Sequence, residues 1–148
     1  MVTVLFSKRH HPGSYLIRAV TWSDWSHCEL LHTDGSTLIG AAAPSGVEYD
    51  TLEHRLQIAT SVVRVDFPGD FDKAWAFAVS QQGKPYDWGG VAGIGLHRDW
   101  QEADRWFCSE LVGKALLEGG FMPYRADLLH RMTPQHLWVL DFPNTRLK

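Results

Sequence analysis

The hydrophobic residues of this chain recur at two spacings, one that suits strands and one that suits helices. Alternating or short continuous apolar runs predict strands at Val2–Phe6, Ser26–His32, Thr37–Ala42 and Ser61–Phe67. The Asp34-Gly35 pair between the second and third of these is typical of a two-residue hairpin turn. We therefore expect those two strands to pair antiparallel and the others to join the same small sheet.

Helical spacing predicts the remaining regular elements. The clearest helix starts at Cys108, places Leu111, Val112, Ala115 and Leu116 on one face, and ends at Gly119-Gly120. Further helices are predicted at Tyr15–Thr21 with Ser14 as N-cap, from Asp70 to Gln82, at Val91–Leu96, at Ala126–Arg131, and after Thr133-Pro134. The mixture of strands and helices predicts an α+β fold.

The other segments are less regular. Residues 47–59 read as a short strand followed by a helical turn, residues 83–90 as irregular, residues 97–105 as a surface loop, and the chain from Phe142 onward as a tail. No repeat, linker or low-complexity segment divides the chain, and 148 residues suit one domain with a real core. We therefore predict a single domain spanning residues 1–148.

Composition removes several classes of function. The net charge is −3 and no basic run is present, which argues against nucleic acid as a partner. No apolar stretch is long enough for a transmembrane segment. Residues 1–9 carry their charges after the apolar part, the reverse of a secretory signal, so we expect a protein that is cytoplasmic as synthesised. The oligomeric state stays open.

Cys108 is the first candidate for chemistry, because the predicted helix begins there. Free N–H groups and the positive end of the helix dipole favour a thiolate at such a position. The alternative is a buried structural cysteine, which is common. Cys28 is the only other cysteine, and in a cytosolic chain we expect two thiols rather than a disulfide.

His27 is the best candidate base for such a thiolate, because it enters a strand beside a partner rich in glycine and alanine. With a two-residue turn, Glu29 faces Gly40 and His27 faces Ala42. Alternation then puts His27 and Glu29 on one face of the sheet, and Cys28 and His32 on the other.

Two motifs together resemble a known family. One is Gly83-Lys84-Pro85-Tyr86-Asp87-Trp88-Gly89-Gly90, and the other is Phe107-Cys108-Ser109-Glu110-Leu111-Val112. They resemble the NlpC-type cysteine peptidases of bacterial cell walls, which carry G-x-P-Y-x-W-G-G and C-S-x-L-V stretches. The histidine strand precedes the cysteine here, an order similar to the circularly permuted papain-like branch, the YiiX-like and lecithin retinol acyltransferase-like proteins. The resemblance covers residues 22–116.

The resemblance implies a permuted papain-like fold, with a small antiparallel sheet packed on helices and the nucleophile at a helix N-terminus. It also implies roles for single residues. Cys108 would be the nucleophile, His27 the general base and then the acid, and Tyr86 a neighbour of the oxyanion together with the Cys108 N–H. No cofactor or metal is implied.

The third residue departs from the family pattern. The strand after the histidine strand, Thr37–Ala42, has no acid, amide or histidine to orient the imidazole. We consider Glu29 the first substitute, because it shares a face with His27 and Gly40 leaves room opposite it. Glu48 is the second. The remaining alternative is a Cys–His dyad oriented by a backbone carbonyl or by water.

Four functions follow, in order of preference. The first is a thiol hydrolase that cleaves an amide, such as a cell-wall peptide, reached through phage delivery or lysis. The second is acyl transfer or lipid-amide hydrolysis at the same site. The third is an inactive papain-like binding or assembly module. The last is a metal site formed by His10, His11, Cys28 and His32, whose spacing matches no standard zinc pattern.

Overall fold

A computed structural model describes residues 1–96, 104–122 and 124–148. The strands in these ranges are β1 (Val2–Lys8), β2 (His27–Leu31), β3 (Thr37–Ala42), β4 (Gly46–Thr51), β5 (Ser61–Phe67) and β6 (Asn144–Arg146). The helices are α1 (Pro12–Thr21), α2 (Leu52–Ile58), α3 (Phe71–Ser80), α4 (Trp88–Leu96), α5 (Cys108–Glu118), the 3-10 helix η1 (Ala126–Arg131) and α6 (Pro134–Trp138). The fold is therefore α+β, as predicted.

The strands form one antiparallel sheet in the order β4-β3-β2-β1-β5-β6. The predicted hairpin register between β2 and β3 is confirmed, because Leu30 pairs with Ile39 and the His32 N–H donates to the Thr37 carbonyl. The same register places Glu29 against Gly40. A Cβ added to Gly40 would lie only 2.7 Å from the Cβ of Glu29.

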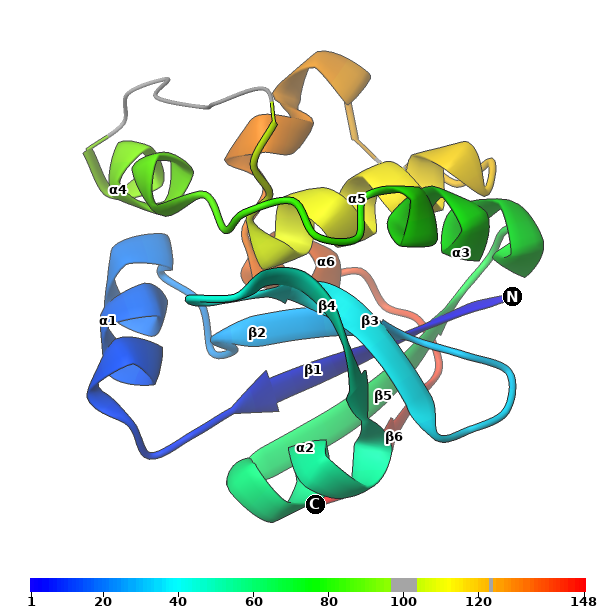
Figure 1. Cartoon of the computed structure of the whole chain (residues 1–148), viewed down its shortest axis with the longest axis horizontal. Coiled ribbons are helices and arrows are strands. Elements are labelled where there is room, and N and C mark those ends of the chain that lie inside the picture. Colours follow the sequence, from blue (N-terminus) through cyan, green and yellow to red (C-terminus); the bar gives the residue numbers. More distant parts are fainter. Residues whose placement is uncertain (97–103, 123) are drawn as a thin grey trace.

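The helices cover the two faces of the sheet unequally. Figure 1 shows α3, α4, α5 and α6 on one side and α2 on the other. The larger core lies on the α5 side and includes Phe6, Phe67 and Leu111. A smaller core on the opposite face joins Leu38 and Val62 of the sheet with partly buried leucines of α2. Residues on β2 are thus buried on both faces, which is the setting of the candidate site.

The predicted starts of two helices were wrong. Helix α1 begins at Pro12, and His11 caps it by accepting the Gly13 N–H, because proline suits the first helical turn. Ser14, the predicted cap, instead donates to the hydroxyl of Ser26. Helix α4 starts at Trp88, within the segment predicted to be irregular.

The prediction of a tail from Phe142 onward was also wrong, because residues 144–146 form strand β6, which pairs with β5. Its three exposed residues show no alternation, so backbone pairing with β5 decides its structure. Other predictions are confirmed: Asp70 caps α3, and residues 46–58 divide into β4 and α2. Residues 97–103 of the predicted loop lie outside the described residues.

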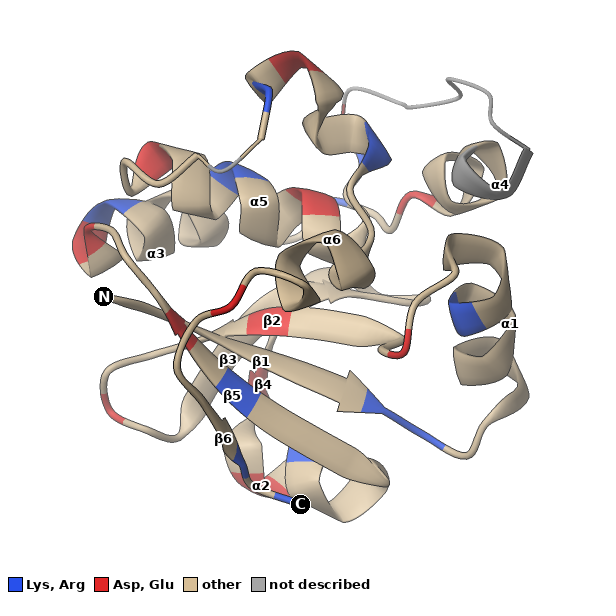
Figure 2. Ribbon diagram, turned by 180° about the vertical axis from the view of Figure 1, so that it is seen from behind, with Lys and Arg blue, Asp and Glu red and all other residues tan. Residues whose placement is uncertain are grey.

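Charge and hydropathy agree with the sequence reading. In Figure 2 acidic and basic residues are interspersed along the ribbon, and strand β2 carries one acidic residue, Glu29. Within the described ranges, no helix is long and apolar enough to cross a membrane.

Candidate active site

Cys108 is the first residue of α5, as predicted. Phe107 precedes it as N-cap and offers no side-chain cap, so the first turn keeps N–H groups for another partner. The helix is held against β2 and β3 by its buried face, and the Ser109 hydroxyl donates to the Met132 carbonyl at 2.6 Å. Cys108 itself is fully buried, so its sulfur lies at the junction of helix and sheet.

His27 reaches Cys108 from the start of β2. Its side chain lies close enough to Cys108 for their charges to interact, and its Nε2 contacts Glu29 at 3.2 Å from Oε2. The predicted sharing of one face by His27 and Glu29 is confirmed.

Glu29 is itself held by an arginine. The Arg55 Nη2 donates to Oε2 at 2.9 Å, and its Nε forms an ion-pair contact of 2.6 Å with Oε1. Arg55 also pairs with Asp50 at 3.0 Å. Both Glu29 and Arg55 are more than nine-tenths buried, so this two-point contact fixes the carboxylate that faces His27.

Arg55 is the site residue that sequence reasoning missed. It comes from α2, in the segment that the pattern left divided between strand and helix. A signal was present, because residues 52, 55 and 56 share one helix face and two of them are leucines. An arginine on the apolar face of a short helix indicates a buried acidic partner.

The charges of this group shift the pKa of the histidine. Burial alone would lower the pKa of His27. The negative charge of Glu29, with hydrogen bonds to Cys108 and Glu29, overcomes both burial and the repulsion from Arg55 and raises the pKa to about 9. Correspondingly, burial opposes the charge on Glu29, but His27 and Arg55 keep its pKa below the usual value. The imidazole is therefore charged near neutral pH.

The pKa of Cys108 moves the other way. Burial would raise it, but hydrogen bonds from Cys28 and His27, together with the imidazolium charge, lower it to about 5. The helix N-terminus acts in the same direction. Cys28, on the opposite face of β2 from His27, stays a thiol, because burial and its neighbours raise its pKa. Cys28 and Cys108 are both buried, and neither is in a disulfide in the structure.

Tyr86 is brought to the same place by backbone pairing. The segment that carries it hydrogen-bonds to Val47 on one side and to Trp106 on the other. Gly46 permits this approach, because a Cβ there would lie 2.1 Å from the Lys84 carbonyl oxygen. The Tyr86 ring is buried against Phe107, and burial followed by the nearby Cys108 charge raises its pKa. The phenol therefore stays protonated and can donate.

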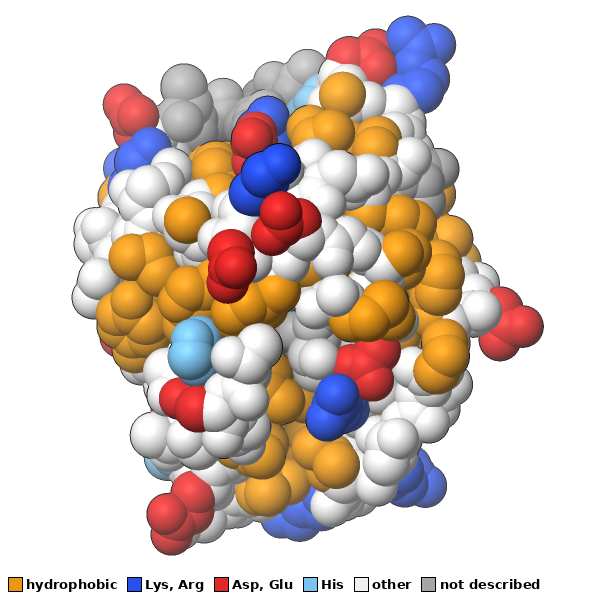
Figure 3. Space-filling view, turned by 90° about the vertical axis from the view of Figure 1, so that its right-hand side faces the viewer, with side chains coloured by type: hydrophobic (Ala, Val, Ile, Leu, Met, Phe, Trp, Pro, Cys, Tyr) orange, Lys and Arg blue, Asp and Glu red, His pale blue; other side chains and the backbone are white. Residues whose placement is uncertain are grey.

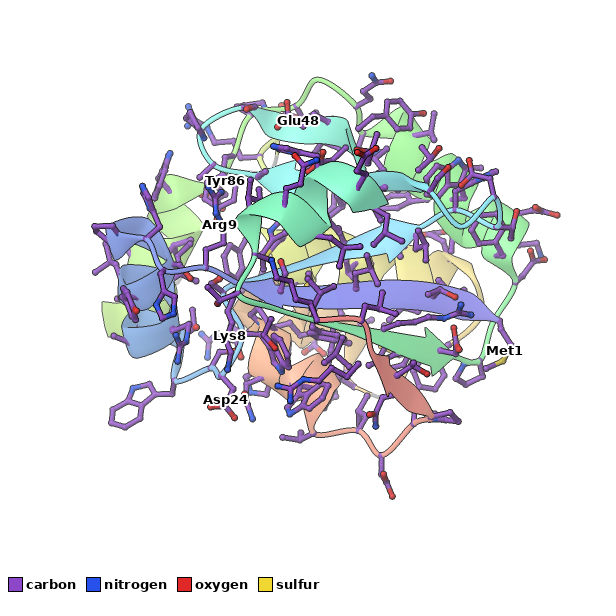
Figure 4. All side chains as sticks on the ribbon, turned by 90° about the horizontal axis from the view of Figure 1, so that it is seen from below. Met1, Lys8, Arg9, Asp24, Glu48 and Tyr86 are labelled. Atoms are coloured by element: carbon purple, nitrogen blue, oxygen red, sulfur yellow. The ribbon has the colours of Figure 1, made fainter. Side chains whose placement is uncertain are left out.

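A cleft of about 410 Å³ opens beside this group. Its walls come from α1, β2, the β3–β4 turn, α2 and the segment before α4, with His27, Arg55 and Tyr86 among the lining residues. This size falls in the range of small-ligand pockets. Figure 4 labels Tyr86 and Arg9 next to one another beside α1, and both line the cleft.

Other candidates lie elsewhere. Glu48 is exposed on β4 opposite Gly40, whereas Glu29 contacts the imidazole, so the structure brings Glu29 and not Glu48 to His27. His32 lies on the other face, where its ring contacts Phe71 and Trp75. Figure 3 views this end of the molecule and shows hydrophobic side chains gathered there.

Comparison with known proteins supports the fold. The chain has the fold of YiiX-type proteins, an α+β arrangement with a six-stranded antiparallel sheet. A crystal structure of the metalloprotein yiiX from Escherichia coli O157:H7 matches it with a TM-score of 0.69 and 21% identity, over 99% of this chain and 95% of that one. No family model matches the chain, and no curated protein matches it in sequence.

The metal of that description has no counterpart among the residues described here. Within residues 1–96, 104–122 and 124–148, no group of three or more His, Cys, Asp or Glu side chains could hold a metal ion. His10 instead contacts the Tyr15 hydroxyl, and His11 caps α1. Among the described residues, these side chains therefore do not offer a donor set for a metal.

Proposed function

We propose that this protein is a thiol hydrolase that cleaves an amide bond through a Cys108 thioester. The observation that carries the proposal is the chain of contacts from Cys108 to His27 to Glu29 and on to Arg55. A nucleophile needs a base, and the base needs an orienting group; Cys108, His27 and Glu29 are the candidates for these three parts. The cleft beside His27 supplies room for a substrate.

The cycle follows from the charge states. The Cys108 thiolate attacks the amide carbon, forming the C–S bond while the carbonyl electron pair moves onto oxygen. The Cys108 N–H and the Tyr86 hydroxyl are the donors nearest to that oxyanion in this proposal. The C–N bond then breaks as the His27 imidazolium gives its proton to the leaving nitrogen, which leaves a thioester.

Water completes the cycle. Neutral His27 takes a proton from a water molecule, whose oxygen attacks the thioester carbon. The C–S bond breaks, the carboxylic acid leaves, and the thiolate–imidazolium pair is restored. Glu29 stabilises the imidazolium each time it forms, and Arg55 keeps Glu29 in position.

The reading as an inactive module loses its main support. That reading rested on a strand without an orienting residue for His27. Glu29 contacts His27 from the histidine's own strand, and Gly40 leaves the space that it needs, which favours Glu29 as the orienting group. By the resemblance to NlpC-type peptidases, the amide would belong to a cell-wall-type peptide, and a substrate screen should begin there.

The test is the rate of iodoacetamide alkylation against pH, with peptide mapping to separate Cys108 from Cys28. We expect Cys108 to react with a midpoint near pH 5, and His27→Ala to move this midpoint toward the free-thiol value of about 8.5. Cys28 serves as the internal control, because its raised pKa keeps it slow. A Cys108 that titrates like a free thiol in folded wild type would overturn the proposal.

A substrate screen follows the same logic. Cell-wall peptides, N-acyl amino acids and phospholipids are offered to wild type and to Cys108→Ala. Release of an amine that depends on Cys108 supports hydrolysis of an amide. Turnover of phospholipid and of no amide would favour the second function, acyl transfer, over amide hydrolysis.

A further inference from the structure

The cleft beside His27 is lined by cationic side chains, although the chain as a whole is acidic. Its lining residues include two arginines and two histidines but no aspartate or glutamate. The net charge of the chain is −3. A site whose charge opposes that of the whole molecule indicates the charge of its ligand.

Only one of the two arginines has its charge matched. Arg55 is buried and pairs with both Glu29 and Asp50. Arg9 is exposed at the rim, and its guanidinium forms no ion pair with any residue in the described ranges. The backbone N–H of Arg9 donates to the Ser14 hydroxyl at 3.2 Å, which anchors its Cα beside the first turn of α1.

The remaining walls are mostly apolar. Ile17, Pro44, Trp88 and the alanines at the end of β3 face the same space. Trp88 is half exposed and stacks edge-on against Tyr86 at 5.0 Å. A ligand that fits this lining has an apolar body and one negative group at the Arg9 end.

We propose that Arg9 binds a carboxylate on the substrate, close to the amide that Cys108 attacks. The inference rests on the proposed function, since it assumes that Cys108 is the reacting atom. One unmatched guanidinium suits a monoanion, and its planar fork matches a carboxylate in two-point contact. The substrate class is then an amide whose acyl or amine part carries a free carboxylate, such as an N-acyl amino acid or a short peptide end.

The first test compares two alkylating reagents that differ only in charge. Iodoacetate carries a carboxylate and iodoacetamide does not, and both react with the Cys108 thiolate. We measure the ratio of the two rates at pH 7 in wild type, in Arg9→Gln, and in Arg131→Gln. Arg131 is the matched control, because it is exposed and lies outside the cleft lining.

We expect Arg9→Gln to lower the iodoacetate-to-iodoacetamide ratio about fivefold, the change that about 1 kcal/mol makes in a rate. Arg131→Gln should leave the ratio as in wild type, and added salt should reduce the wild-type preference. If Cys108 reacts with iodoacetamide as a thiolate but the ratio is equal in wild type and Arg9→Gln, the role of Arg9 is refuted while the nucleophile stands.

A second measurement does not depend on a reactive thiol. In Cys108→Ser, the backbone amide shifts of Gly13 and Ser14, which line the cleft, are followed by NMR during titration. The ligands are N-acetylglycine, N-acetylglycinamide and N-acetyl-aminomethylphosphonate. Binding of the first alone, lost in Arg9→Gln, supports the proposal even if alkylation fails. Tighter binding of the phosphonate, or equal binding of the uncharged amide, contradicts a carboxylate site.

Discussion

At the scale of single residues, the site depends on a carboxylate that comes from the strand of the histidine itself. Glu29 follows His27 by two positions in the sequence. Its Oε2 contacts the imidazole Nε2 of His27 and accepts a hydrogen bond from the guanidinium of Arg55. Same-face neighbours in a strand lie about 7 Å apart at Cα. The contact therefore needs both side chains to lean toward each other, and Arg55 holds Glu29 in that position.

Glu29→Gln should weaken the thiolate–imidazolium pair. The amide keeps the shape of the side chain but loses the charge that raises the pKa of His27, so a smaller imidazolium population stabilises less thiolate. We expect the midpoint of Cys108 alkylation to move upward by one pH unit or more and amide turnover to fall at least tenfold.

Two variants serve as controls for this experiment. Glu48→Gln and His32→Ala remove groups that lie away from His27, so both should keep the wild-type midpoint. A wild-type profile in Glu29→Gln would remove Glu29 from the site. The site would then be a dyad oriented by another group.

At the scale of elements, the space for Glu29 comes from the neighbouring strand. Gly40 on β3 lies directly opposite Glu29, and an added Cβ would approach the Glu29 Cβ to 2.7 Å, closer than real Cβ contacts allow. Gly40→Ala should push β2 and β3 apart or turn Glu29 away from His27. We expect a raised midpoint for Cys108 alkylation together with a lower melting temperature.

Gly83→Ala is the comparison for this variant. A Cβ at Gly83 meets nothing within 4 Å, but its φ of +85° is unfavourable for alanine, so the variant should cost about 1 kcal/mol of stability. Its alkylation midpoint should stay at the wild-type value. If Gly40→Ala behaves like Gly83→Ala, the close approach of Gly40 does not control the site.

The elements also show how far the sequence alone can predict this site. The helix at Cys108 and the strand at His27 could be predicted because each has a clear apolar pattern. The turn between β2 and β3 could be predicted from its Asp34-Gly35 pair. Strand β6 was not, because three exposed residues carry no period and form only against β5. Local spacing places Arg55 on the apolar face of a short helix, but its partner Glu29 depends on which face of the sheet α2 covers, and local spacing does not contain that information.

At the scale of the whole molecule, the site lies where elements distant in sequence meet. Helix α5 packs on one face of the sheet and α2 on the other (Figure 1). Cys108 of α5 and Arg55 of α2 therefore approach His27 and Glu29 of β2 from opposite faces. The predicted roles of Cys108, His27, Tyr86 and Glu29 remain predictions, but the fold brings the four residues together. The cleft and its charge could not be read from sequence, because five separate segments form its walls.

The buried side chain of Glu110, near this junction, lowers the stability of the folded protein when it is charged. Glu110, in the first turn of α5, is 4% exposed. Burial and the charge of nearby Asp87 raise its pKa from an ordinary 4.5 to about 7, although the Phe107 N–H opposes this. The folded protein therefore binds the Glu110 proton more tightly than the unfolded chain does, and the charged form is disfavoured inside the fold.

Glu110→Gln should accordingly stabilise the protein at high pH only. As pH rises from 4.5 to 7 the unfolded chain releases this proton first, so the folded wild type loses up to about 3 kcal/mol of stability and does not regain it above pH 7. Glutamine carries no charge and avoids the loss.

Denaturant unfolding should show Glu110→Gln more stable than wild type at pH 8, with the difference disappearing below pH 4.5. Glu118→Gln, at the exposed end of the same helix beside Lys114, is the control for replacing a glutamate outside the core. A difference of equal size at pH 4 and pH 8 would mean that packing, and not the buried charge, sets the cost of Glu110.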